Sequence, residues 1–109
     1  MKYAPVGERG VALSIAHDDY TAGDVHAKLS QANDESLVII QIESALAVEN
    51  LEAMLAVPGV DVAWVGHFDL SVSMGIPGQF DHPRFQAAMD RVVEVSDRHG
   101  VTPGLMQPD

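Results

Sequence analysis

Hydrophobic residues form three short continuous runs in the second two-thirds of the chain. Residues 37–43 (LVIIQIE) and 60–66 (VDVAWVG) are rich in β-branched side chains and apolar at most positions, a pattern typical of strands that are covered on both faces. Residues 101–106 (VTPGLM) predict a third strand, although Pro103 removes one backbone donor and weakens that prediction.

In the segments before and between these runs, apolar residues recur at the three- and four-residue spacing that is typical of helices. Pro83 suits the first turn of a helix because its φ is fixed and its missing N–H is not needed there, and Gly100 suits the end of the same helix. Pro58 and Gly59 stop an earlier helix. We predict helices over residues 21–33, from residue 44 to about Val57, and from Pro83 to the Gly100 cap, with an irregular segment over residues 1–20 and a loop over residues 67–82.

Strands that alternate with helices of about a dozen residues predict right-handed βαβ crossovers and a parallel sheet, so the fold class is α/β. Functional residues in such folds collect where the strands end. Glu43 and the loop of residues 66–71 are therefore expected on one edge of the sheet. Gln41 shares a face with Glu43, since side chains two apart on a strand point the same way.

The length, charge and cysteine content of the chain exclude several classes of function. The chain has 109 residues, with six Lys plus Arg and sixteen Asp plus Glu, for a formal charge of −10. This length predicts one small domain, and this charge argues against nucleic acid or anionic membranes as partners. The absence of Cys excludes disulfides and thiolate zinc sites. No apolar run approaches a membrane span and the first ten residues lack a signal-peptide core, so the expected location is cytoplasmic.

Two carboxylates with almost no converging cation favour a hard divalent metal at the predicted edge. Glu43 and Asp69 follow neighbouring predicted strands, and Mg²⁺ or Mn²⁺ commonly binds one or two protein carboxylates together with water and substrate oxygens. A second interpretation remains open from the spacing. In it Glu43 caps the following helix and Asp69 caps a short turn over residues 70–74.

The same residues resemble a known family. Residues 38–44 (VIIQIES) and 60–71 (VDVAWVGHFDLS), followed by Met74-Gly75 and His82-Pro83, are similar to the HpcH/HpaI family of metal-dependent pyruvate aldolases. Residues 2–10 (KYAPVGERG) look like the Tyr-Pro-Pro segment of that family, which ends in Arg-Gly. The resemblance covers essentially the whole chain, and it implies a partial TIM (β/α)₈ barrel that comprises about strands five to seven with their helices.

The resemblance also implies a function for this single partial domain over residues 1–109, in which the amino-terminal half of the barrel is missing. The family implies a carbon–carbon lyase that acts on 2-oxo acids and releases or adds pyruvate through a metal-stabilised enolate. Glu43 and Asp69 would ligate Mg²⁺ or Mn²⁺, with Co²⁺ as an alternative. Gln41 would be a catalytic residue near the pyruvate, and the backbone N–H groups of Phe68 and Asp69 would hold its carboxylate.

One departure from the family pattern concerns the pocket. His67 and Phe68 stand where the family usually has Pro and a small residue, so Phe68 is expected to alter which acceptor aldehyde fits. We interpret His67 as an ordinary polar contact in preference to a base.

Two further expectations concern the chain as a whole. Three parallel strands leave two open edges and a half-covered apolar surface, so a homo-oligomer is expected, and a non-catalytic self-associating module is the alternative to the aldolase. A receiver-like domain with Asp69 as phosphoacceptor is disfavoured, because the required acidic residues and late lysine are not visible.

Overall fold

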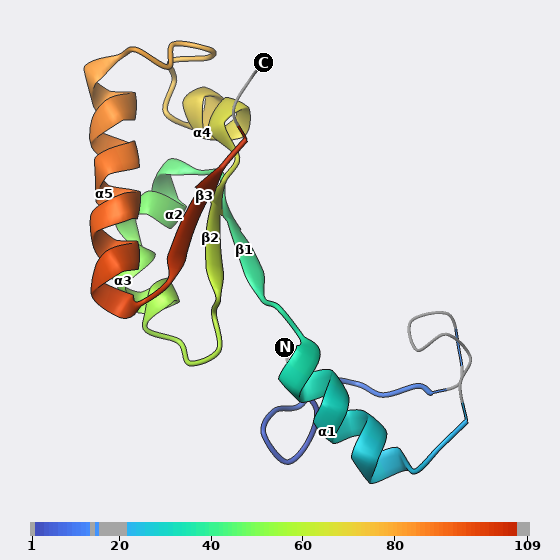
Figure 1. Cartoon of the computed structure of the whole chain (residues 1–109). Coiled ribbons are helices and arrows are strands. Elements are labelled where there is room, and N and C mark those ends of the chain that lie inside the picture. Colours follow the sequence, from blue (N-terminus) through green and yellow to red (C-terminus); the bar gives the residue numbers. More distant parts are fainter. Residues whose placement is uncertain (1, 14, 16–21, 107–109) are drawn as a thin grey trace. The chain divides into compact units, whose positions relative to one another are not determined.

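The computed structural model describes residues 2–13, 15 and 22–106. The chain divides into two compact units, residues 1–36 and 37–109, which are coloured from blue to cyan and from cyan to red in Figure 1. Residues 1, 14 and 16–20 of the predicted irregular segment, and Thr21 at the start of the predicted helix, lie outside the described residues. None of the helices in the described ranges is long and apolar enough to cross a membrane.

The first unit contains helix α1 (Val25–Glu35), which begins where the Asp24 carboxylate accepts a hydrogen bond from the Ala27 N–H at 2.8 Å. The Asn33 side chain accepts from the Tyr3 N–H and donates to the Tyr3 carbonyl, at 2.6 and 3.1 Å. These two bonds tie the amino-terminal segment to α1 and leave the Tyr3 ring buried. The helix predicted over residues 21–33 is therefore present, but it starts later because Asp24 caps it.

The second unit is a parallel three-stranded sheet with helices. Its elements in chain order are β1 (Ile39–Ile42), α2 (Ala45–Glu49), α3 (Leu51–Leu55), β2 (Val62–Val65), α4 (His67–Ser73), α5 (Pro83–His99) and β3 (Thr102–Leu105). The strand order is β1-β2-β3, and Gln41, Trp64 and Gly104 occupy one level across the three strands. The predicted α/β class with parallel βαβ units is confirmed.

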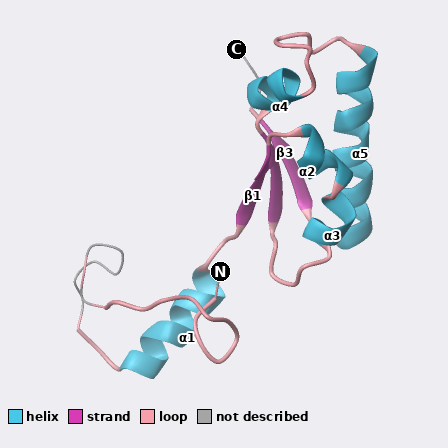
Figure 2. Ribbon diagram, turned by 180° about the vertical axis from the view of Figure 1, so that it is seen from behind, coloured by secondary structure: helices cyan, strands magenta, loops and turns pink. Residues whose placement is uncertain are grey.

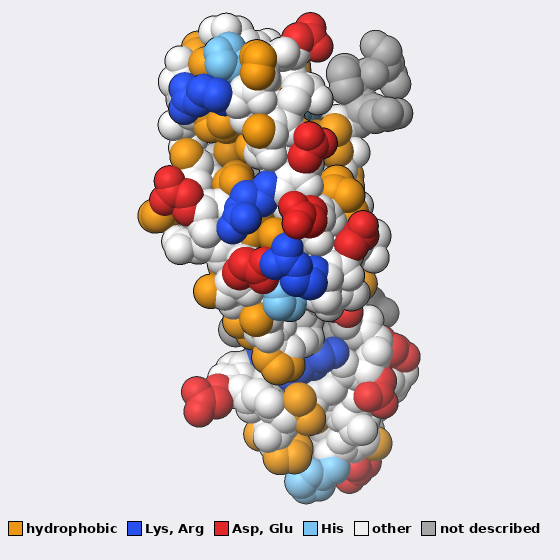
Figure 3. All heavy atoms as spheres, turned by 90° about the vertical axis from the view of Figure 1, so that its left-hand side faces the viewer, with side chains coloured by type: hydrophobic (Ala, Val, Ile, Leu, Met, Phe, Trp, Pro, Cys, Tyr) orange, Lys and Arg blue, Asp and Glu red, His pale blue; other side chains and the backbone are white. Residues whose placement is uncertain are grey.

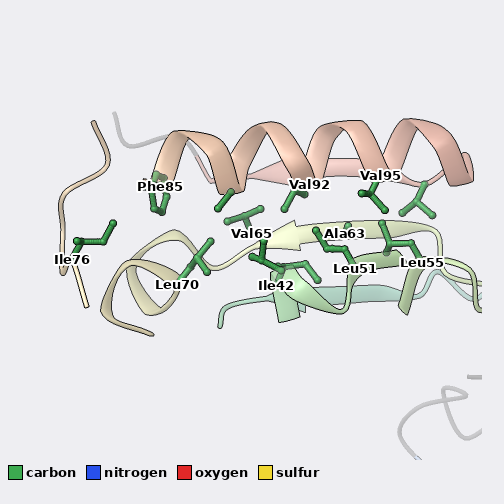
Figure 4. Packing of buried hydrophobic residues seen from close by; sticks show 13 residues of the cluster. Ile42, Leu51, Leu55, Ala63, Val65, Leu70, Ile76, Phe85, Val92 and Val95 are labelled. Carbon is green, nitrogen blue, oxygen red and sulfur yellow. The ribbon is translucent and has the colours of Figure 1, made fainter. Parts of the chain in front are cut away.

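Helices α2, α3 and α5 lie on one face of this sheet, and α4 lies beyond the carboxyl end of β2 (Figures 1 and 2). The core fills the space between the sheet and these helices. Ile42 and Val65 point from the strands toward Val92 and Val95 of α5 (Figure 4), and all four side chains are almost completely buried.

Two predicted elements differ from the structure. The helix predicted from residue 44 to Val57 is divided at Asn50 into α2 and α3, and the predicted loop over residues 67–82 contains α4 in its first half. Helix α5 agrees with its prediction at both ends, since Pro83 occupies the first turn and Gly100 adopts a left-handed φ of 67° at the cap. The opposite sheet face is partly open, with Ile39 about half exposed.

Candidate functional site

Gln41 and Glu43 meet over a glycine at the carboxyl end of the sheet. A Cβ atom on Gly66 would lie 2.9 Å from Gln41 Nε2 and 3.0 and 3.4 Å from Glu43 Cβ and Oε2. The Gly66 N–H donates to the Ile42 carbonyl at 3.0 Å, so the ladder between β1 and β2 continues to this point. Only glycine leaves the space in which both polar side chains lie. The structure therefore brings two of the predicted site residues, Gln41 in β1 and Glu43 just after it, to the same glycine.

Glu43 is not a helix cap. The Ser44 hydroxyl accepts from the Ala47 N–H at 3.1 Å and caps α2, and the Ala45 N–H donates to the Ser73 hydroxyl at 3.0 Å. The Glu43 carboxylate is exposed, and no described residue forms a hydrogen bond or ion pair with it. The interpretation of Glu43 as a cap is therefore wrong, and its carboxylate is available for another role.

Asp69 is not the cap of a turn over residues 70–74 either. Helix α4 begins at His67 with Gly66 as its cap residue, which places Asp69 inside the first helical turn. Its carboxylate is exposed, and within the described ranges it has no hydrogen-bond or ion-pair partner. The Leu70 N–H is the first to bond within the helix, to the Gly66 carbonyl at 2.9 Å. The preceding N–H groups have no carbonyl to bond in the helix.

The donors at this edge suit a hard divalent cation. Both free side chains are carboxylates, and the space over Gly66 is one that a Cβ would fill. In the described part of the chain no three His, Cys, Asp or Glu side chains gather into a metal-binding group. The set therefore fits a cation that takes one or two carboxylates and fills its other positions with water or substrate oxygens, and it does not fit an ion that needs several nitrogen or sulfur ligands.

Ser71 is a buried polar residue beside this site that sequence reasoning did not single out. Its hydroxyl donates to the Phe68 carbonyl at 2.7 Å and accepts from the Gly78 N–H at 2.9 Å. It thereby fixes the segment after α4 against the first turn of that helix. The Asp-Leu-Ser motif was visible in the sequence, but the partner at Gly78 depends on the path of the following loop.

An aromatic cluster, formed by His67, Phe68, Phe80 and Phe85, lies at the same end of the sheet. Phe80 is its centre, with ring centroids at 5.1 Å from His67, 5.4 Å from Phe68 and 5.4 Å from Phe85. His67 therefore packs against rings, and no hydrogen bond to its side chain is present among the described residues. Phe85 is buried whereas Phe68 is 59% exposed.

The outer surface of α5 has a different character. Figure 3 shows acidic and basic side chains mixed along it. Arg98 pairs with Glu52 and Glu94, and His99 Nε2 lies 2.7 Å from the Glu52 carboxylate. Arg91 Nε donates to the Val48 carbonyl at 3.0 Å. These contacts hold α5 to α2 and α3, so this face supports the fold and does not extend the site.

Comparisons with known proteins agree with this architecture. A solved HpcH/HpaI aldolase from Desulfitobacterium hafniense is 39% identical, with a TM-score of 0.85 over 99% of this chain and 42% of that chain. Two curated relatives from Klebsiella pneumoniae, a 2-keto-3-deoxy-L-rhamnonate aldolase and a 5-keto-4-deoxy-D-glucarate aldolase, are each 36% identical over 99% and 98% of this chain.

The chain spans about 40% of the length of these curated relatives. That share is consistent with a partial barrel, as predicted. The family described as HpcH/HpaI aldolase/citrate lyase matches residues 1–105. The chain therefore belongs to the HpcH/HpaI aldolase/citrate lyase family.

Proposed function

We propose that this chain carries the metal-binding and pyruvate-binding portion of an aldolase that acts on 2-oxo acids. The observation that carries the proposal is the space over Gly66, where Gln41 and Glu43 lie together just before the helix that bears Asp69. Family membership supports carbon–carbon lyase chemistry. The isolated chain is expected to be weakly active or inactive, since the relatives are more than twice as long.

In this proposal Glu43 and Asp69 hold Mg²⁺ or Mn²⁺, with Co²⁺ as an alternative. The bound cation supplies Lewis-acid stabilisation of negative charge on the substrate. The Gln41 amide lies beside the keto acid and orients it by hydrogen bonding. The N–H groups of Phe68 and Asp69 precede the hydrogen-bonded ladder of α4, and they donate to the pyruvate carboxylate.

The reaction balances without an oxidant or a reductant. In the cleavage direction the bond between C3 and C4 of a 4-hydroxy-2-oxo acid breaks, and its electron pair stays with C3 as the enolate form of pyruvate. The C4 hydroxyl loses its proton to a base as C4 becomes the carbonyl of the released aldehyde. A proton added at C3 completes pyruvate.

The direct test is calorimetric titration of the chain with Mn²⁺, with and without pyruvate. Glu43→Gln and Asp69→Asn keep the shape of each side chain and remove its charge, so each should weaken Mn²⁺ binding at least tenfold and remove the effect of pyruvate. Glu49→Gln is the matched control, because Glu49 is also exposed but lies on α2. Equal heats for the wild type and all three variants would remove the metal site from the proposal.

Self-association is proposed alongside this function, and a non-catalytic self-associating module is the alternative to it. Strands β1 and β3 each have one partner in the described sheet, and Leu37, Ile39 and Met106 are more than half exposed. Open edges and exposed apolar side chains favour pairing with a second copy. Sedimentation velocity should detect a homo-oligomer. A compact monomer that binds no hydrophobic dye would contradict this expectation.

A further inference from the structure

A hydrogen bond joins the two segments that carry the proposed metal ligands. The Ala45 N–H, at the first residue of α2, donates to the Ser73 hydroxyl at 3.0 Å, and Ser73 is the last residue of α4. Ala45 follows Glu43 by two residues, and Asp69 lies in the first turn of α4. One serine hydroxyl therefore links the segment after Glu43 to the helix that bears Asp69 (Figure 2).

The other end of α4 is attached to β1 by a backbone bond. The Gly66 N–H donates to the Ile42 carbonyl at 3.0 Å, and Gly66 is the residue before α4. Because Gly66 has a non-helical ψ of 79°, this bond fixes where α4 begins and leaves open the direction in which it departs. The bond to Ser73 fixes the far end, and two fixed ends determine the direction of the helix axis.

The remaining contacts of α4 keep the helix ordered and on the core. The Leu70 side chain is fully buried, and the Ser71 hydroxyl bonds the Phe68 carbonyl and the Gly78 N–H. Those hydrogen bonds lie within α4 and the loop that follows it. Among the described residues, no other hydrogen bond joins α4 to residues 43–49. Ser73 is thus the polar contact that ties the direction of α4 to the segment after Glu43.

The position of Asp69 depends on the direction of α4. Asp69 is three residues beyond Gly66, about 4.5 Å along the helix axis, so a tilt of about 10° about Gly66 moves it by roughly 0.8 Å. Mg²⁺ takes its ligands at about 2.0–2.1 Å in a nearly ideal octahedron. A displacement of that size would take the Asp69 carboxylate out of reach of a cation held by Glu43.

We propose that Ser73 is a positioning residue for the metal site. By accepting the Ala45 N–H, its hydroxyl sets the separation between the Glu43 and Asp69 carboxylates. This inference rests on the function proposed above, because it takes both carboxylates as ligands of one cation. Ser73 acts through the backbone of α2 and α4, so its effect on the cation depends on the presence of Asp69.

Titration with Mn²⁺, followed by the EPR signal of the free ion, tests this role. Ser73→Ala removes the acceptor and should weaken Mn²⁺ binding about three- to tenfold, as expected for a residue that supports a ligand. Ser73→Thr should bind Mn²⁺ within about twofold of the wild type, because either hydroxyl accepts from an N–H at a helix terminus. Ser30→Ala is the control, since it removes an exposed serine hydroxyl from α1 and should leave Mn²⁺ affinity unchanged.

A double-mutant comparison separates positioning from a general loss of structure. In the Asp69→Asn background, Ser73→Ala should lower Mn²⁺ affinity by less than about 1.5-fold, since the carboxylate that Ser73 positions is already gone. The urea midpoint of Ser73→Ala should stay within about 0.5 M of the wild type, because Ser73 is exposed and water can replace its hydroxyl.

Three results would overturn this inference alone: wild-type Mn²⁺ affinity in Ser73→Ala, no recovery in Ser73→Thr, or an equal loss on adding Ser73→Ala to Asp69→Asn. Equal Mn²⁺ affinity in the wild type and Asp69→Asn, or no binding by the wild type, overturns the metal site of the proposed function, and the inference with it.

Discussion

Replacing Gly66 by alanine should disable the site without removing any polar group. Gly66 has φ −81° and ψ 79°, a backbone conformation close to an inverse γ-turn that alanine also adopts. The new Cβ would lie 2.9 Å from Gln41 Nε2 and 3.0 Å from Glu43 Cβ. The Gln41 amide is the end of a flexible side chain and can turn away, whereas Glu43 Cβ is next to the backbone and must shift.

A shift of a few tenths of an ångström in Glu43 moves a ligand out of its coordination distance. We expect Mn²⁺ affinity, measured by calorimetry with pyruvate present, to fall about tenfold, which corresponds to about 1.4 kcal/mol. The free energy of unfolding in urea should change by less than about 1 kcal/mol, because the lower entropy of the unfolded alanine chain offsets the local crowding. Gly10→Ala is the control, since a Cβ there meets nothing within 4 Å. Wild-type Mn²⁺ affinity in a folded Gly66→Ala protein would refute the placement of the metal beside Gly66.

Three further substitutions test the surrounding structure. Ser96 is fully buried and its hydroxyl has no hydrogen-bond partner in the described structure, so Ser96→Ala should raise the free energy of unfolding in urea by about 1–2 kcal/mol; a loss would show that the hydroxyl is satisfied. Ser71→Ala leaves the Gly78 N–H without its acceptor, so it should lower stability by about 1–3 kcal/mol and accelerate hydrogen exchange at Gly78; unchanged exchange would argue against this bond. A Cβ on Gly104 would lie 2.7 Å from the Trp64 ring, so Gly104→Ala should destabilise the sheet by about 1–3 kcal/mol and shift the fluorescence of the only tryptophan; an unchanged spectrum and midpoint would contradict the contact.

Local signals explain which elements could be predicted from the sequence. Helix α5 was predictable because Pro83 and Gly100 mark its two ends and its apolar stripe is long. The division between α2 and α3 was not, since Val48, Leu51 and Leu55 all face the core and continue one periodic pattern across Asn50.

Helix α4 was placed in a predicted loop for a related reason. It has only seven residues, and two of them, Leu70 and Ser71, are buried. A pattern that short does not establish a helical period.

Part of the candidate site could also be predicted from the sequence, and part could not. Gln41 and Glu43 share a strand face by simple alternation, so their convergence could be predicted without a structure. The roles of Ser71 and Phe80 could not, because their partners are set by how residues 74–82 return along α4. The spacing of residues in the sequence predicts which side chains are neighbours on one helix or strand. It does not predict which side chains meet when a loop folds back on a helix.

The distribution of charge connects the metal to the substrate. Glu43 and Asp69 follow β1 and β2 at the carboxyl end of the sheet, and no Lys or Arg occurs from residue 29 to residue 83, so the segments that directly follow these two strands bring negative charge and no cation. Pyruvate is an anion, and like charges repel unless a cation lies between them. A divalent ion at Glu43 and Asp69 would cancel the charge of both ligands and give the keto acid a favourable approach. If Glu43 and Asp69 hold the cation as proposed, we therefore expect the 2-oxo acid to bind this edge only after the cation has bound.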